Sequence, residues 1–354
     1  MNTSPDWQYD YDVLTKFICN HPEIEIDICK TRIPDGIREQ FYALFNKMLS
    51  GFIAGLNAEL LVTSVLLSEC YQKTAQSLTD YANIKISNSP SVARFALNPS
   101  NETLNSLFEV LWDLLKGKIT ANSFSSLAVK KINETIEPLF IEVYQQWILF
   151  SLLIMLDFTS MQQVALGSLS RYGVHKSQLS TGSVPAPINS TNILFSHESA
   201  VKFIVPNVIA YSAKLAKYCG FRSGITRPLL KANKLSSMRE WACLPPIEKI
   251  VKYNQLFIYL SDTSEDIRLV ADTHYLCKPD VILEFLVGNE AGLGDIITRI
   301  ERQHEYLRPP AGTFIIFANK IPEMLQLSKE NMHVIGVEFE RDRLQPLIDR
   351  LVVC

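Results

Sequence analysis

Apolar residues in the first half of the chain recur at steps of three and four, which is the spacing of one face of an α-helix. The pattern is clearest over Phe41–Ile53, and Leu60–Leu67 continues it in a second expected helix. Two further amphipathic helices are predicted over Glu102–Lys116 and Val129–Asp157. Between them, the Asn-, Ser- and Pro-rich stretch Tyr81–Ser100 predicts a long loop.

These patterns divide the chain into three parts. Residues 1–170 form a predicted all-helical domain, serving either as scaffold or as a recognition or dimerisation domain. Residues 171–195 begin with a stretch rich in Gly, Pro, Ser and Thr, which indicates a linker or a loop that closes over a site. Residues 196–354 form a basic helical connector followed by an α/β domain. Within the connector, Asn207–Tyr218 fits a helix because its apolar residues fall on one side.

Strand-like runs replace the helical spacing after residue 255. Three strands that follow one another closely predict a meander, and alternating strands and helices follow it. We therefore expect an α+β protein whose C-terminal domain has a mixed sheet. The predicted elements are strands at Leu256–Leu260, Arg268–Tyr275 and Asp280–Val287, a helix at Leu293–Leu307, strands at Thr313–Ala318 and His333–Phe339, and a final helix that includes Leu344–Leu351.

Composition narrows the setting of the protein. The 354 residues are 47% hydrophobic and 20% charged, as in a globular chain. Seven cysteines contain no CxxC pair, which favours a reducing cytoplasm. The acidic N-terminus has no signal-peptide pattern, and the apolar run Trp147–Leu156 is too short to span a bilayer, so no membrane association is expected.

Charge is unevenly distributed along the chain. Residues 1–170 contain 18 acidic and 12 basic side chains, whereas residues 202–239 contain eight Lys or Arg and no Asp or Glu. Such a segment attracts a polyanion, and we expect nucleic acid as the partner. The alternatives are a solvated basic face or one docked on the acidic N-terminal half. The expected nucleic-acid-binding residues are Lys214, Lys217, Arg222, Arg227, Lys231, Lys234 and Arg239.

A pair of acidic residues is the most informative chemical feature. If the turn between two of the predicted strands centres near Lys278, Asp272 lies directly opposite Glu284. Two facing carboxylates repel unless a cation or a shared proton lies between them. Magnesium, or manganese, suits such a carboxylate pair. The plainer alternative is that Asp272 is an edge residue and Glu284 forms an ion pair with Arg268 or Lys278.

The order helix, three strands, helix, strand, with Asp272 on the second strand and Glu284 on the third, resembles the PD-(D/E)xK nuclease superfamily. The resemblance covers about residues 228–340. It implies a magnesium-dependent phosphodiesterase in which Asp272 and Glu284 hold the ion and a lysine two residues after the Glu activates water. Gln303 and Tyr306 are similar to a Gln/Tyr element of some of these nucleases.

The chain departs from the family at that lysine, because Leu286 follows Glu284 by two residues. The lysine's role would have moved to Lys278 or Arg268, or the domain would be catalytically inactive. We expect a nucleic-acid-associated protein, and the first hypothesis is a metal-dependent nuclease using Asp272, Glu284 and Lys278. The alternatives are an inactive nuclease-like binding or assembly protein and a ligand sensor with a Rossmann-like C-terminal domain. Oligomerisation through the N-terminal helices is compatible with each.

Overall fold

The computed structural model of this protein describes residues 7–56, 59–165, 186–188, 192–194, 208–223, 255–264, 267, 279–287, 292–323, 325 and 327–353. The chain forms two compact units. The helical unit contains Met1–Glu69 and Ser91–Phe140, and the sheet unit contains Cys70–Pro90 and Ile141–Cys354. Residues 141–170, at the end of the expected helical domain, therefore belong to the sheet unit.

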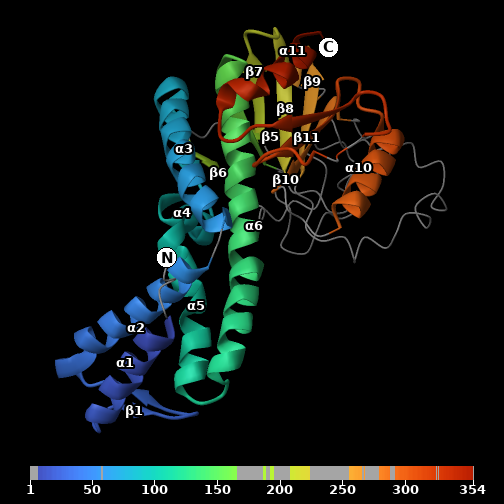
Figure 1. Ribbon diagram of the computed structural model, residues 1–354. Helices are drawn as coiled ribbons and strands as arrows, with labels where there is room; N and C mark the ends of the chain where they lie inside the picture. The colour runs from blue at the N-terminus through green and yellow to red at the C-terminus, as the bar shows by residue number, and fades with distance from the viewer. Residues whose placement is uncertain are drawn as a thin grey trace, which may run out of the picture. The chain divides into compact units, whose positions relative to one another are not determined.

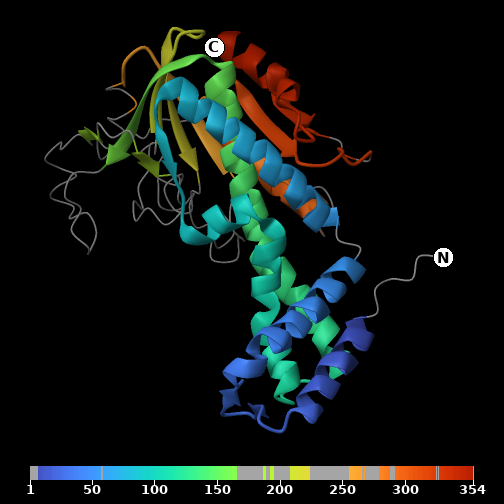
Figure 2. The same ribbon diagram turned by 90° about the vertical axis from the view of Figure 1, so that its left-hand side faces the viewer.

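Aromatic side chains form much of the core of the helical unit. In α2 (Asp35–Gly55), Phe41 and Phe45 are fully buried because their spacing gives the helix one apolar face. Both rings pack against Trp112 of α5 (Pro99–Leu115), at centroid distances of 5.7 and 5.1 Å. Figure 2 shows α2 beside α1 (Trp7–Asn20), both in blue. The remaining elements are β1 (Glu25–Ile26), β2 (Thr31–Arg32), the start of α3 (Glu59–Ala82), α4 (Pro90–Leu97) and the start of α6 (Ala121–Met155).

The prediction of a long loop over Tyr81–Ser100 is wrong. The segment contains the end of α3, the short strand β3 (Lys85–Ser87) and α4. Pro90 begins α4 at a position where the helix needs no N–H donor, so the proline does not prevent a helix. Asn98 then caps α5, its side chain accepting a hydrogen bond from the Asn101 backbone N–H at 3.0 Å. Residues that suggest a loop therefore begin helices here.

An eight-stranded mixed sheet is the centre of the sheet unit, in the order β12-β11-β10-β9-β8-β7-β4-β5. Neighbouring strands from β5 to β10 are antiparallel, whereas β10, β11 and β12 are parallel, and α10 (Leu293–Leu307) makes the crossover between β10 and β11. Helices followed by this mixed sheet confirm the predicted α+β class. The other bounds are β4 (Phe158–Ala165), β5 (Ala186–Ile188), β7 (Val208–Ser212), β8 (Lys217–Ser223), β9 (Gln255–Ser261), β10 (Val281–Leu286), β11 (Gly312–Phe317), β12 (Met332–Gly336), η3 (Arg341–Leu344) and α11 (Gln345–Val353), with β6 (Asn192–Leu194) paired to β3.

The helix predicted over Asn207–Tyr218 is also wrong, because these residues form the hairpin of β7 and β8. The turn contains no glycine, and Ala216 takes a left-handed φ of 53° instead. The hairpin also caps the end of α6. The Ser212 hydroxyl donates to the Leu156 carbonyl and accepts from the Leu215 N–H, and both interactions stabilise this turn beside the helix end.

Helices cover both faces of the parallel part of the sheet (Figure 1). Phe285 and Leu286 are consecutive residues of β10 and therefore point to opposite faces. The Phe285 ring packs edge-on against Tyr144 of α6 at 6.0 Å, whereas Leu286 belongs to the cluster that contains Ile297 and Ile300 of α10. The strands are thus buried on both sides, as their continuous apolar sequences predict.

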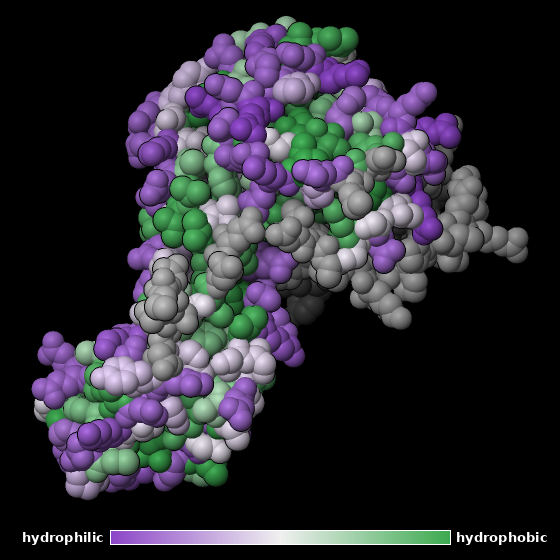
Figure 3. Space-filling view, in the orientation of Figure 1, coloured by the Kyte–Doolittle hydropathy of each residue, from purple (hydrophilic) through white to green (hydrophobic). Residues whose placement is uncertain are grey.

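Helix α6 is long and apolar enough to cross a membrane by length and composition, but 78% of that apolar window is buried inside the protein. Within the sheet unit it packs beside the end of α3. Tyr71 donates a hydrogen bond to the Gln146 side chain at 3.0 Å, and the Trp147 indole donates to the Thr74 hydroxyl at 3.2 Å. Figure 3 shows apolar surface, in green, in patches among polar side chains.

Candidate functional site

Glu284 lies on β10, the strand where the antiparallel part of the sheet meets the parallel part. It is the fourth residue of β10, a strand whose six residues are all buried. On one side its ladder partner is Gln255 of β9, and on the other side it is Ile315 of β11. Because both neighbouring positions are filled, the predicted cross-strand pairing of Asp272 with Glu284 is wrong. Asp272 itself lies outside the described residues.

A chain of hydrogen bonds connects Glu284 to the helix above it. The Gln255 amide donates to the Glu284 carboxylate and also to the Gln303 side-chain oxygen, the latter at 2.7 Å. The Gln303 amide donates back to the Gln255 oxygen at 3.3 Å. Gln255 and Glu284 are 0% and 2% exposed, whereas Gln303 on α10 is partly buried. We call these three side chains the amide–carboxylate chain.

Burial explains why Glu284 needs these partners. A carboxylate transferred from water to a protein interior loses its hydration, and the loss is tolerated only when hydrogen bonds or a cation replace it. Gln255 supplies one replacement from the next strand. Periodicity alone does not single out Gln255, because a single polar residue at the start of QLFIYLS also fits an ordinary strand end.

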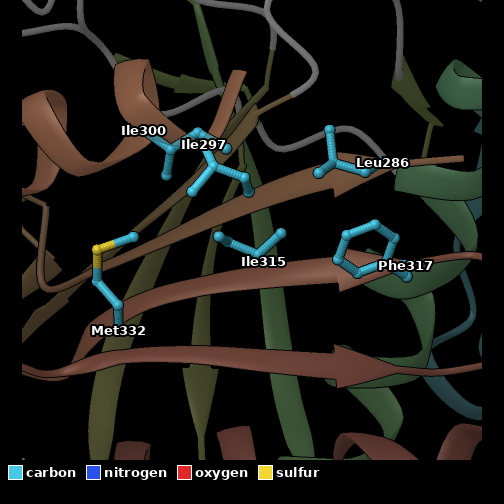
Figure 4. Packing of buried hydrophobic residues seen from close by; sticks show 6 residues of the cluster. All are labelled: Leu286, Ile297, Ile300, Ile315, Phe317 and Met332. Atoms are coloured by element: carbon cyan, nitrogen blue, oxygen red, sulfur yellow. The ribbon is translucent and has the colours of Figure 1, made fainter. Parts of the chain in front are cut away.

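Leu286 lies two residues after Glu284, where the resemblance to the nucleases would place a lysine. The side chain is 5% exposed and belongs to the apolar cluster beneath α10. Figure 4 shows Leu286 beside Phe317 and Ile315, with Ile297 and Ile300 of α10 nearby. Since Leu286 and Glu284 are two residues apart on one strand, they share a face. On the Leu286 side, the space next to the Glu284 carboxylate is therefore packed with hydrocarbon.

A second acidic residue, Asp280, has a structural role at the other end of β10. Its carboxylate accepts a hydrogen bond from the Leu260 backbone N–H at 2.6 Å, and its carbonyl accepts from Ala311 at 2.9 Å. Burial raises the pKa of Asp280, while the Leu260 hydrogen bond and Lys217 oppose that shift. Four residues at the rise of a strand separate Asp280 from Glu284 by about 13 Å, too far to share one ion.

The predicted metal site is not assembled from the described side chains. Within the described ranges, no three His, Cys, Asp or Glu side chains gather closely enough to hold a metal ion. Around Glu284 these residues supply one carboxylate and the amide oxygens of Gln255 and Gln303. Oxygen donors suit magnesium, but a single carboxylate is short of the implied pair. Lys278, the predicted catalytic cation, lies outside the described residues.

The structure describes three of the residues predicted to bind nucleic acid. Lys214 and Lys217 lie at the β7–β8 turn, where the Lys214 ammonium donates to the Met155 carbonyl at 3.4 Å. The ladder sets Tyr218 opposite Ser261, six residues from Gln255, so Lys217 lies about 20 Å along the strands from Glu284. Arg222 is closer to Glu284, because its backbone pairs with Phe257. Outside the described residues lie Arg227, Lys231, Lys234 and Arg239.

Comparisons of this chain with protein families, curated proteins and solved structures find no match.

Proposed function

We propose that this protein associates with nucleic acid and that its sheet unit, built on a nuclease-like strand order, binds without hydrolysing phosphodiester bonds. Part of the strand order supports a nuclease-like sheet unit. Strands β8, β9 and β10 are antiparallel neighbours in the sheet, and β11 joins β10 in parallel after α10. The resemblance to the PD-(D/E)xK nucleases also expects a strand at Arg268–Tyr275, which lies outside the described residues. Glu284 lies on β10, the strand on which the resemblance expects an acid.

The burial of Leu286 carries the non-hydrolytic part of the proposal. In the family, the residue at this position is a lysine that activates water. Here the side chain packs against Ile315 and Phe317, in a layer that would not solvate an ammonium group. The Glu284 carboxylate beside it is hydrogen-bonded to a neutral amide.

The basic segment 202–239 supports nucleic acid as the partner. Eight cations without a carboxylate form a charge pattern suited to phosphates, and Lys214, Lys217 and Arg222 belong to its described part. Of the three, Arg222 lies on the strand next to β9, close to the Glu284 end of the ladder. Lys214 also contacts the end of α6, so its substitution would mix capping with binding. Lys217 and Arg222 are therefore the better residues to test.

Binding is tested by fluorescence anisotropy with single- and double-stranded oligonucleotides at several salt concentrations. We expect an affinity that falls steeply as the salt concentration rises. The slope of log affinity against log salt concentration should decrease in magnitude by about one for each phosphate contact removed. Lys217→Gln and Arg222→Gln are compared with Lys130→Gln, a matched change in the helical unit. Affinity that does not depend on salt, or equal loss in all three variants, would contradict nucleic-acid binding through this segment.

A divalent-metal-dependent nuclease is the second candidate, favoured by the placement of a buried acid, Glu284, on the third strand. Asp272 and Lys278 remain its predicted partners. Cleavage of plasmid and single-stranded DNA is measured during magnesium and manganese titrations of wild type, Glu284→Gln and the control Glu323→Gln. Metal-dependent cleavage that is lost only in Glu284→Gln would establish the nuclease and overturn the non-hydrolytic proposal. Salt-sensitive binding without cleavage supports that proposal.

A further inference from the structure

The last turn of α10 is joined to the sheet through a buried histidine. The Nδ1 atom of His304 lies 2.9 Å from the Thr313 hydroxyl oxygen, near the start of β11. The two side chains are 9% and 1% exposed. The imidazole also makes a hydrogen bond with the backbone of Glu330, in the connection between β11 and β12. One ring therefore joins α10, β11 and the segment that precedes β12.

The surroundings of this ring disfavour a positive charge. Burial is the main cause that lowers the pKa of His304, and Lys329 acts in the same direction, whereas Glu305 and the hydrogen bond with Glu330 oppose it. His333 on β12 is a second histidine nearby, and burial, Arg350 of α11 and His304 all lower its pKa. The charged groups around the two rings thus come from α10, the β11–β12 connection, β12 and α11.

His333 gives no compensation for a proton on His304. Its ring packs on Phe314 at a centroid distance of 4.8 Å, and its Nε2 atom is buried without a hydrogen-bond partner in the described part of the chain. A second positive charge here would be desolvated and would face Arg350. The surroundings therefore favour the neutral form of both imidazoles in the closed arrangement.

We propose that the His304–Thr313 contact is a pH-sensitive joint that holds the C-terminal turn of α10 on the sheet and releases it on acidification. Gln303, the α10 member of the amide–carboxylate chain, is the residue before His304 in that turn. Release of the turn withdraws Gln303 from Gln255 and uncovers the side of the Gln255–Glu284 pair that α10 closes. The inference is independent of nucleic-acid binding, because it concerns only the packing of α10.

Linkage fixes the direction of the effect. An exposed histidine titrates near pH 6.5, and the pKa of His304 is lower when the joint is closed. Below about pH 6.5 the open state binds the proton first, so the closed state loses stability as pH falls. The opening equilibrium rises by a factor of ten for each unit of difference between the open and closed pKa values.

Hydrogen exchange of the α10 amides, corrected for the intrinsic effect of pH, measures that opening in the full chain. When the pH is lowered from 7.5 to 5, we expect faster amide exchange in residues 300–307. The size of this increase should match the factor calculated from the pKa of His304, which NMR titration of its imidazole provides. His304→Asn keeps a polar group near the Nδ1 position and removes the charge, so its corrected exchange should not change with pH. His21→Asn, at a half-buried histidine of the helical unit, should behave as wild type.

Thr313→Val keeps the joint titratable when His304→Asn folds poorly. It removes the hydroxyl and retains the imidazole, so α10 should exchange faster at every pH while the acid-dependent increase remains. Corrected exchange of α10 in wild type that is constant across the pH range would overturn the proposal, as would an imidazole that titrates near pH 6.5 in the folded protein. Equal acid sensitivity in His304→Asn and wild type would also overturn it.

Discussion

Gln255 and Glu284 face each other across the β9–β10 ladder, and the Gln255 amide donates a hydrogen bond to the Glu284 carboxylate. The sequence alone suggests an acid, Asp272, in the place that Gln255 occupies. The difference changes the chemistry of the site. Two facing acids require a cation or a shared proton, whereas an amide stabilises a single buried carboxylate directly. Glu284 therefore has a structural reason to be in the sheet, and any ligand would compete with Gln255.

The interdependence of this pair is the first prediction. Gln255→Leu leaves the Glu284 carboxylate without this donor and should lower the free energy of unfolding by about 1–3 kcal/mol. The same change in a Glu284→Leu background should cost clearly less, because neither polar group is then left behind. Guanidinium unfolding of the four proteins measures the coupling. Additive losses would mean that the two side chains do not depend on each other.

The lysine position gives the second prediction. Leu286→Lys introduces the lysine that the resemblance to the nucleases would place there, at a side chain that is 5% exposed and packed with Ile315 and Phe317. We expect a loss of about 3 kcal/mol or more, because the ammonium group would be buried in an apolar layer where the nearby Glu284 carboxylate already accepts a hydrogen bond from Gln255. Leu286→Met, which preserves volume and polarity, should cost less than about 1.5 kcal/mol. Equal stability of the two variants would show that the position can accommodate a charge.

A backbone contact between β11 and the turn before β12 gives the third prediction. Gly312 has a φ of +102°, and a Cβ atom there would lie 2.5 Å from the Asn331 carbonyl oxygen. Gly312→Ala should therefore lower the unfolding free energy by about 2–4 kcal/mol in thermal or denaturant unfolding. Gly294→Ala is the matched control, because nothing lies within 4 Å of its Cβ position in α10. The control should be neutral or stabilising by up to about 1 kcal/mol.

The fourth prediction concerns the pH dependence of stability at Asp280. Burial raises the pKa of this carboxyl in the folded protein, so folding favours the neutral acid. The contribution to stability is fully present below the unfolded Asp value of about 3.9 and is lost as pH rises through the folded pKa. Asp280→Asn keeps an acceptor for the Leu260 N–H and removes the charge.

The advantage of Asp280→Asn over wild type should thus increase as pH rises above about 4 and then become constant. Unfolding free energies of the two proteins at intervals from pH 3.5 to pH 7.5 measure this difference. Asp349→Asn, an exposed change in α11, is the control. A difference between Asp280→Asn and wild type that shrinks as pH rises would contradict the assigned direction of the pKa shift.

Local periodicity predicts the C-terminal part of the fold closely. Helix α10 begins and ends at the predicted residues, Leu293 and Leu307, because five apolar side chains repeat along one face and Gly292 precedes it in a left-handed conformation. Strands β9, β10 and β11 lie within one residue of their predicted positions. In these elements every residue's local preference agrees with the sheet, so sequence spacing is sufficient.

The hairpin β7–β8 marks where spacing is insufficient. Val208, Tyr211 and Leu215 lie at steps of three and four, yet Val208–Ser212 also fits a strand buried on both faces. The usual turn residues are missing, and Ala216 takes the left-handed conformation that glycine or asparagine normally provides. Packing against the end of α6 decides between the two structures. That contact joins segments far apart in the sequence.

One member of the candidate site, Glu284, is predictable from the sequence, whereas its hydrogen-bond partners are not. Glu284 is conspicuous as an acid inside an apolar strand, and such a residue needs a partner. The identity of that partner depends on which strand lies next to β10, and strand order is a property of the whole sheet. Gln255 belongs to a strand 29 residues away in the sequence, and Gln303 to the following helix.

The composition of the sheet unit has a consequence for how the chain folds during synthesis. Cys70 contacts the Phe339 carbonyl, 269 residues later, and Tyr71 and Thr74 bond to α6. Residues 70–90 therefore leave the ribosome long before β12 is synthesised. Their contact with Phe339 can form only after the last strands have been made. Contacts of such sequence separation slow folding and prolong the exposure of apolar surface. Nascent chains that stop before β12 should accordingly depend on chaperones.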